Sequence, residues 1–185
     1  MVSAHSSSRS LDRVKVEIAS ARAIAREPRI VRLIEVPQCG VRVRQIRVTV
    51  RGREVPSWDQ PILDSSGEGK VLLACGRIDG VLHFLFRAQA EPGLHDKVEL
   101  TPTVVAPPGE TSNAGIAGTV VAECRQSEEG GRFYRDTNHY QIVDVGEACD
   151  ADYWLTLGDV RQLLDEPGWL TNEARSALSL LLPWL

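Results

Sequence analysis

The sequence predicts an α+β domain, with a sheet in the middle of the chain and helices at both ends. Apolar and polar residues alternate along several central runs, which is the pattern of strands. Near both termini, apolar residues instead recur at helical spacing. The 15 glycines and 10 prolines among 185 residues divide the central runs into short segments. Strands grouped together between helices, rather than alternating with them, are typical of α+β folds.

The first predicted helix covers residues 11–26. Ser10 and Asp12 can cap its start, and the Glu27–Pro28 step ends it. The serine-rich residues 1–10 before it predict a flexible arm, which leaves residues 11–185 as one domain. The apolar positions of this helix are Leu11, Val14, Ile18, Ala21 and Ala25.

Extended segments dominate the next part of the chain. Residues 41–51 alternate valine or isoleucine with arginine, as expected of a half-buried antiparallel strand. Residues 55–63 contain two prolines and predict an extended, irregular segment. Residues 71–75 and 81–89 predict two strands, and Asp79–Gly80 between them predicts a tight hairpin turn.

The second half continues the sheet and closes with helices. Residues 98–105 predict an extended run broken by a proline. A polar loop at 127–138 separates two further strands at 118–126 and 139–145. Two helices are expected at 156–165, capped by Thr156, and at 171–182, capped by Thr171.

Composition and charge exclude several partners. The chain has 21 Lys and Arg against 25 Asp and Glu, a net charge of −4, whereas nucleic-acid binding needs a basic face. No apolar run approaches the ~18 residues of a membrane span. The start, MVSAHSSSRS, lacks the apolar stretch of a secretory signal, so a cytoplasmic location is expected.

The four cysteines do not form a metal-binding pattern. They lie 36, 49 and 25 residues apart, and zinc sites commonly contain at least one closely spaced pair. We expect Cys39, Cys75, Cys124 and Cys149 to be reduced thiols, and those in apolar strands to act as small hydrophobic residues. No metal or cofactor is therefore expected, and the chain also lacks dinucleotide, phosphate-loop and hydrolase motifs.

Two ionisable residues lie inside apolar strands. His83 shares a strand face with Val81 and Leu85, so it is expected to point inward, either as a hydrogen-bonded core residue or as a general base. Glu99, between Val98 and Leu100, is either a solvent-facing carboxylate or one that binds a ligand hydroxyl.

Two loop regions combine aromatic and polar residues. In the 127–138 loop, Gly130–Gly131 permits close backbone approach to an anion and Arg132 offers a fork for phosphate oxygens. The alternative is a polar hairpin loop. Trp58 and Gln60 suit stacking on a base or sugar, or else the tryptophan covers a sheet edge.

Eight strings in a fixed order resemble the NDP-hexose 2,3-dehydratases of deoxysugar biosynthesis. The resemblance runs from about residue 40 to residue 182, and SEEGGRFY is its most distinctive string. The strings are WDQP (58–61), GVLHF (80–84), EPG (91–93), VELTPT (98–103), SEEGGRFY (127–134), NHYQIV (138–143), YWLTL (153–157) and NEARS (172–176).

This resemblance implies a Nudix-like α+β fold without the Nudix catalytic box. It also implies a cofactor-independent lyase that removes water across C2 and C3 of a dTDP-4-keto-6-deoxyhexose. The residues assigned to proton transfer are His83, Glu99 and Tyr134. The residues assigned to nucleotide-sugar binding are Trp58, Gln60, Thr103, Glu128, Arg132, Asn138 and Tyr140.

The sequence departs from the family pattern in two respects. Family members carry two tandem copies of this domain and this chain holds one, which predicts a homodimer. Val105 stands where the family has a glutamine. Two alternatives therefore stay open: an isomerase or cyclase acting on another biosynthetic intermediate, or a non-catalytic partner subunit.

Overall fold

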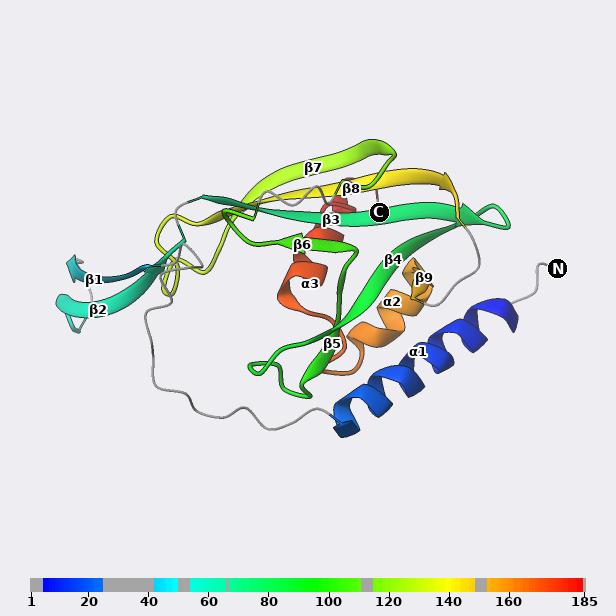
Figure 1. Cartoon of the computed structure of the whole chain (residues 1–185), viewed down its shortest axis with the longest axis horizontal. Coiled ribbons are helices and arrows are strands. Elements are labelled where there is room, and N and C mark those ends of the chain that lie inside the picture. The colour runs from blue at the N-terminus through cyan, green and yellow to red at the C-terminus, as the bar shows by residue number, and fades with distance from the viewer. Residues whose placement is uncertain are drawn as a thin grey trace.

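The computed structural model describes residues 5–24, 42–49, 54–65, 67–110, 115–148 and 153–184 (Figure 1). The helices are α1 (His5–Ile24), α2 (Leu157–Leu164), α3 (Asn172–Ser179) and the short 3-10 helix η2 (Leu182–Trp184). The first strands are β1 (Arg42–Thr49), β2 (Ser57–Asp64), β3 (Glu68–Ile78), β4 (Val81–Ala90) and β5 (Val98–Pro102). The others are β6 (Val104–Ala106), β7 (Thr119–Ser127), β8 (Thr137–Glu147) and β9 (Trp154–Thr156).

The main sheet is mixed, which confirms the predicted α+β class. Its central order is β5-β4-β3-β8-β7, and β6 and β9 add to β3 and β4 respectively. β3 and β8 run parallel, and the other pairs in this sheet are antiparallel. The short strand β9 was not predicted.

The helices cover one face of this sheet and form the core with it (Figure 1). Alternate residues of β3 and β8 point toward the helices, in keeping with the two-residue period of strands. The predicted α1 positions Leu11, Val14 and Ile18 are fully buried. The main sheet residues of this core are Val71, Leu73, Cys75, Phe84, Phe86, Leu100, Tyr140 and Ile142.

The β3–β4 hairpin turns at Asp79–Gly80, as predicted. Both residues have positive φ, 51° and 77°, as the favoured two-residue hairpin turns require. The resulting register buries Phe84 and Phe86, so His83 lies on the opposite face and its Nδ1 is 2.8 Å from the carbonyl oxygen of Val81. The expectation that His83 points inward is wrong, because the face of β4 that packs in the core is the one that carries Phe84 and Phe86.

Helix starts were predicted well near the C-terminus and less well near the N-terminus. Thr156 and Thr171 cap α2 and α3 as expected, and Asp159 completes a capping box with Thr156. Helix α1 begins at His5, within the segment expected to be an arm, and not near Ser10. Residues 1–4 and the Glu27–Pro28 step lie outside the described residues.

Strands β1 and β2 form a separate two-stranded ribbon (Figure 1). The expected half-buried strand is largely exposed, since Val43 has 53% of its surface open to solvent. The segment that its prolines marked as irregular is strand β2, with Pro61 opposite Gln45. An edge strand such as β2 tolerates a proline, which has no N–H to donate.

Both cysteines in the described residues are free thiols, as expected, but only one of them is buried. Cys75 is a free, buried thiol, and burial, followed by the charge of Asp144, raises its pKa to about 11. Cys124 is also free but exposed, so it does not act as a core residue. Cys39 and Cys149 lie outside the described residues.

Two further findings concern the described part of the chain. Among these residues, no three or more His, Cys, Asp or Glu side chains are grouped so that they could hold a metal ion. No helix described here is both long and apolar enough to cross a bilayer.

Thr103 connects the strands where the extended run 98–105 breaks into β5 and β6. Its hydroxyl donates to the carbonyl of Leu85 (2.6 Å) and accepts from the N–H of Ala74 (2.9 Å). Thr103→Val should therefore lower the free energy of unfolding by about 1–3 kcal/mol, because it leaves polar backbone groups unpaired. Urea denaturation measures this, and Thr103→Ser, which keeps the hydroxyl, should retain most of the stability. Equal losses in both variants would contradict the assignment.

Candidate functional site

The loop between β7 and β8 packs against strand β2 through its backbone. The N–H of Leu63 donates to the carbonyl of Arg132 (2.9 Å), and the N–H of Tyr134 donates to the carbonyl of Leu63 (2.7 Å). The N–H of Glu128 donates to the carbonyl of Asp136 (3.0 Å) and closes the loop at its base. The loop thus joins the main sheet to the β1–β2 ribbon, as Figure 1 also shows.

Trp58 and Gln60 are connected to the same loop. The indole Nε1 of Trp58 donates to Oε1 of Gln60 (2.7 Å), and Nε2 of Gln60 donates to the carbonyl of Gly131 (2.9 Å). Both side chains are half-buried. The structure therefore brings together two regions that the sequence singled out separately.

A polar cluster lies at the base of the loop, where β8 begins. The amide Nδ2 of Asn138 donates to Oε1 of Glu128. Tyr140, two residues further along the same strand face, has side-chain hydrogen bonds with Asn138 and with Ser176 of α3. Only 2% of Tyr140 is exposed, whereas Glu128 is partly open to solvent. Glu128 is therefore the group of this cluster that a ligand can reach first.

The environment of Glu128 favours its neutral form. Burial is the largest cause that raises the pKa of its carboxyl, and the negative charges of Glu173, Glu129 and Asp136 add to it. A carboxyl whose pKa is raised toward neutrality is suited to general acid–base catalysis. Burial likewise raises the pKa of Tyr140, so its hydroxyl stays protonated.

Asp136 completes the base of the loop. Its carboxylate accepts a hydrogen bond from the hydroxyl of Ser65, which follows β2. The side chain is almost fully buried. Asp136 therefore fixes the end of the loop to the end of β2, on the side where Glu128 and Asn138 lie.

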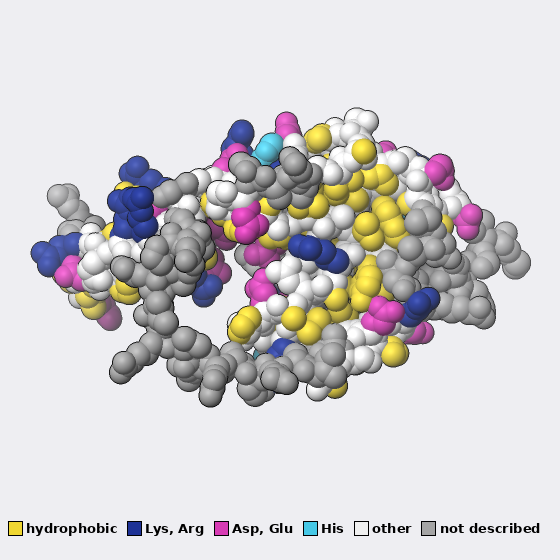
Figure 2. Space-filling model, viewed as in Figure 1, with side chains coloured by type: hydrophobic (Ala, Val, Ile, Leu, Met, Phe, Trp, Pro, Cys, Tyr) yellow, Lys and Arg dark blue, Asp and Glu magenta, His cyan; other side chains and the backbone are white. Residues whose placement is uncertain are grey.

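The other end of the loop is basic and aromatic. The guanidinium carbons of Arg44 and Arg135 each lie 5.3 Å from the ring centroid of Tyr134, and Arg44 forms an ion pair with the buried Asp64. The side chain of Arg132 is 66% exposed. Figure 2 shows Lys and Arg side chains gathered over the β1–β2 ribbon, in a chain with a net charge of −4. This end of the loop is suited to binding an anionic group.

Three predicted site residues lie elsewhere. His83 pairs with Gly76 on β3, whereas Asn138 pairs with Gly69. These two β3 positions are separated by seven residues, or about 23 Å at roughly 3.3 Å per residue. Glu99, on β5, is buried, so it is not the solvent-facing carboxylate that one reading expected. The hydroxyl of Thr103 forms the two hydrogen bonds to backbone groups described above. Nearby Val105 packs against the core.

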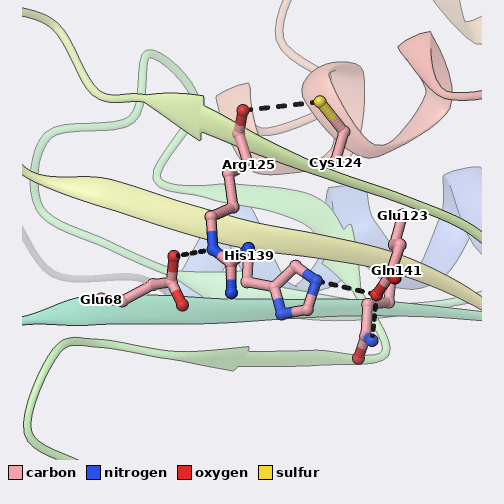
Figure 3. A network of polar contacts seen from close by, with 6 residues as sticks. All are labelled: Glu68, Glu123, Cys124, Arg125, His139 and Gln141. Atoms are coloured by element: carbon pink, nitrogen blue, oxygen red, sulfur yellow. Dashed lines mark hydrogen bonds and ion pairs between the residues drawn. The ribbon is translucent and has the colours of Figure 1, made fainter.

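A second polar network occupies the opposite face of β7 and β8 (Figure 3). Glu123 accepts hydrogen bonds from Nε2 of Gln141 (3.0 Å) and Nε2 of His139 (2.9 Å), which lower the pKa of its carboxyl. Arg125 pairs with Glu68 at 2.7 Å. His139 and Gln141 alternate along β8 with Asn138 and Tyr140, so this network is separated from the loop-base cluster by the sheet.

Sequence reasoning missed several members of the site. Glu173 and Ser176 were available in the NEARS string, but without a structure nothing linked that helix to the loop. Arg44 was interpreted as one of several solvent-facing strand arginines. Arg135 and Asp136 lie inside the loop but outside its SEEGGRFY string.

Comparison with known proteins identifies the family. A family model described as NDP-hexose 2,3-dehydratase matches residues 3–181. The chain belongs to this family. The match covers the loop, the ribbon and α3, so every element of the site described above falls within it.

Three curated relatives are each named dTDP-4-dehydro-6-deoxy-alpha-D-glucopyranose 2,3-dehydratase. The one from Saccharopolyspora spinosa is 36% identical over 74% of this chain and 32% of its own length. The one from Streptomyces violaceoruber is 37% identical over 66% of this chain and 30% of its own length. The Amycolatopsis orientalis protein is 32% identical over 67% and 30% respectively. The chain thus spans about a third of the length of these family members.

Proposed function

We propose that this chain is a carbon–oxygen lyase that removes water across C2 and C3 of a dTDP-4-keto-6-deoxyhexose. Family membership supports the reaction, and the names of the three relatives support the substrate. The single structural observation that carries the proposal is the β7–β8 loop. It has a cationic, aromatic end near Arg132 and Tyr134, and a partly buried carboxyl with a raised pKa, Glu128, at its base.

The reaction needs a base, an acid and no change of oxidation state. The 4-keto group acidifies the proton on C3, a base removes it, and the C2 hydroxyl leaves as water with help from an acid. The resulting C2–C3 enol tautomerises to a 3,4-diketone. Glu128 is the proposed base, because a pKa raised toward neutrality strengthens a carboxylate as a base while leaving it ionisable.

The acid and the substrate-binding residues are assigned from the remainder of the loop and from strand β2. Tyr134, predicted from the sequence for proton transfer, is the proposed acid, and Arg132 is the proposed diphosphate ligand. Trp58 and Gln60 are proposed to contact the nucleotide, since their hydrogen bonds fix them to this loop. His83 and Glu99 receive no step in this scheme.

Two wider features belong to the same proposal. The sheet and its helices are proposed to be a Nudix-like arrangement without the Nudix catalytic box. The protein is proposed to work without a cofactor, because the elimination of water changes no oxidation state and needs no electron carrier. It is proposed to work in the cytoplasm, where the free thiols of Cys75 and Cys124 would stay reduced.

Thermal stabilisation by ligands tests the substrate class. A ligand that binds only the folded state at a hundred times its Kd raises the free energy of unfolding by about 2.7 kcal/mol. We expect dTDP to stabilise the chain and thymidine, which lacks the diphosphate, to stabilise it less. No stabilisation by either ligand would contradict the nucleotide-sugar assignment.

We also propose that the protein acts as a homodimer. An apolar cavity of about 410 Å³ is lined by residues of β4, the start of α2 and Leu181. Next to Leu181 in the chain, Leu182 has 68% of its surface exposed. Pairing of two copies across this surface would remove apolar area from water on both subunits at once.

Leu182→Glu should therefore shift the protein from dimer to monomer without unfolding it. In a two-fold interface, the new carboxylate of one subunit lies near that of the other subunit. Their repulsion adds to the cost of removing both charges from water. Light scattering at several concentrations measures the mass, and Val16→Glu, at a residue with a similar 65% exposure on α1, is the matched control. A wild-type monomer at high concentration would contradict the proposal.

A further inference from the structure

The position of Asn138 depends on a glycine in the neighbouring strand. Asn138 of β8 lies opposite Gly69 of the parallel strand β3. A Cβ atom built on Gly69 would overlap Oδ1 of Asn138 and lie 3.0 Å from its Cγ. Carbon atoms in folded proteins do not approach this closely without a shift of one partner. Gly69 therefore provides the space that the amide of Asn138 occupies.

That amide lies between the two groups of the loop-base cluster. Its Nδ2 donates to Glu128, and its side chain also shares a hydrogen bond with the hydroxyl of Tyr140. Tyr140 is in turn held by Ser176 of α3. The contacts thus run from helix α3 through a buried tyrosine and the amide of Asn138 to Glu128.

We propose that Gly69 is a positioning residue that, by leaving space for the Asn138 amide, holds the Glu128 carboxyl in its orientation for proton transfer. Only the role given to Glu128 rests on the proposed function. A hydrogen bond from an amide N–H stabilises the carboxylate, and therefore works against the burial and the charges that raise the pKa of Glu128. The charged groups that raise the pKa of Glu128 are Glu173 of α3 and Glu129 and Asp136 of the loop, and the uncharged hydroxyl of Tyr140 lies on the same strand face as Asn138.

The test is a pH titration of Glu128 on the whole chain without substrate. The NMR signal of the side-chain carboxyl carbon reports the protonation of Glu128 at each pH. Asn138→Ala removes the donor and should raise the midpoint of Glu128 by about one to two pH units, the equivalent of a hydrogen bond to a charged group. Gly69→Ala should raise the midpoint in the same direction, because the new methyl group displaces the amide. Gly93→Ala, at a glycine with no atom within 4 Å of the new Cβ, is the matched control and should leave the midpoint unchanged.

The double variant separates positioning from a general strand defect. If Gly69 acts through Asn138, adding Gly69→Ala to Asn138→Ala should change neither the midpoint nor the melting temperature much further, since the atoms it collides with are gone. The nearest remaining neighbour, the carbonyl oxygen of Ala106, is 3.3 Å away and needs only a small adjustment. If Gly69→Ala changes the midpoint and the melting temperature by the same amount in the wild type and in Asn138→Ala, the inference is overturned.

The positioning role of Gly69 and the proposed reaction can be tested separately. If Gly69→Ala does not fold, Asn138→Asp still tests the amide: it replaces the donor with a second carboxylate and should raise the Glu128 midpoint more than Asn138→Ala does. An unchanged midpoint in that variant would overturn the inference. If the titrations behave as expected but the chain removes no water from a dTDP-4-keto sugar, the positioning role stands and the proposed reaction is wrong.

Discussion

Glu128→Gln should reduce turnover by about 10²–10⁴-fold, the usual contribution of a positioned general base. Glutamine keeps the size of the side chain but cannot accept the C3 proton. The loss should appear in kcat, with little change in KM, because the diphosphate contacts at the other end of the loop remain. Steady-state kinetics on a dTDP-4-keto-6-deoxyhexose measures both constants.

The control for this variant is Glu123→Gln, the same substitution on the opposite face of the sheet (Figure 3). Its turnover should stay close to that of the wild type. If the two variants have equal turnover, Glu128 is not the base, and the proton is removed by a group outside the loop-base cluster.

The same substitution should change how stability depends on pH. The pKa of Glu128 lies above the ordinary glutamate value of 4.5, so its neutral form stabilises the fold below that value and this contribution is lost as pH rises. Glutamine does not ionise. The unfolding free energy of Glu128→Gln relative to wild type should therefore increase as the pH rises above the ordinary glutamate value of 4.5. A constant difference would contradict the raised pKa.

Arg132→Ala should weaken dTDP binding by about tenfold to a hundredfold, the range for loss of a hydrogen bond to a charged group. The side chain is exposed and its carboxylate neighbour Glu129 is 3.7 Å away, so its removal should leave stability within about 0.5 kcal/mol of wild type. Isothermal titration calorimetry with dTDP measures the affinity directly.

Arg13 offers a closely matched control. Its side chain is also 66% exposed and lies 3.6 Å from a carboxylate, Glu17, but it is on helix α1. Arg13→Ala should bind dTDP as tightly as the wild type does. Equal weakening in both variants would indicate a general effect of positive charge, and no weakening in either would place the diphosphate elsewhere.

Local sequence patterns were enough to predict most of the main sheet and the C-terminal helices. Asp79–Gly80, Thr156 and Thr171 act through their own backbone or their immediate neighbours, so their roles can be recognised from a few residues. The face of His83 could not be predicted in this way. Both faces of β4 carry apolar residues: Val81 and Leu85 lie on one face, and Phe84 and Phe86 lie on the other. Only packing against the helices decides which of these faces is buried.

The candidate site could be proposed from the sequence where its residues lie close together in the chain, but not where they come from distant segments. The loop strings pointed to Glu128, Arg132, Asn138 and Tyr140, because unusual residues lie close together in the sequence. The contributions of Gly69, Ser176 and Glu173 depend on β3 running parallel to β8 and on α3 packing beneath them. Such pairings join segments far apart in the chain, and periodicity carries no information about them.

Incubation of the purified chain with a dTDP-4-keto-6-deoxyhexose in deuterated water, followed by mass spectrometry and NMR, tests the proposed function most directly. The proposed reaction predicts a product that has lost one molecule of water, carries a 3,4-diketone and has gained deuterium at C2, where the enol is protonated by solvent. Glu128→Gln should form this product far more slowly. Recovery of intact substrate from a wild-type chain that binds dTDP would contradict the proposal that this chain performs the elimination.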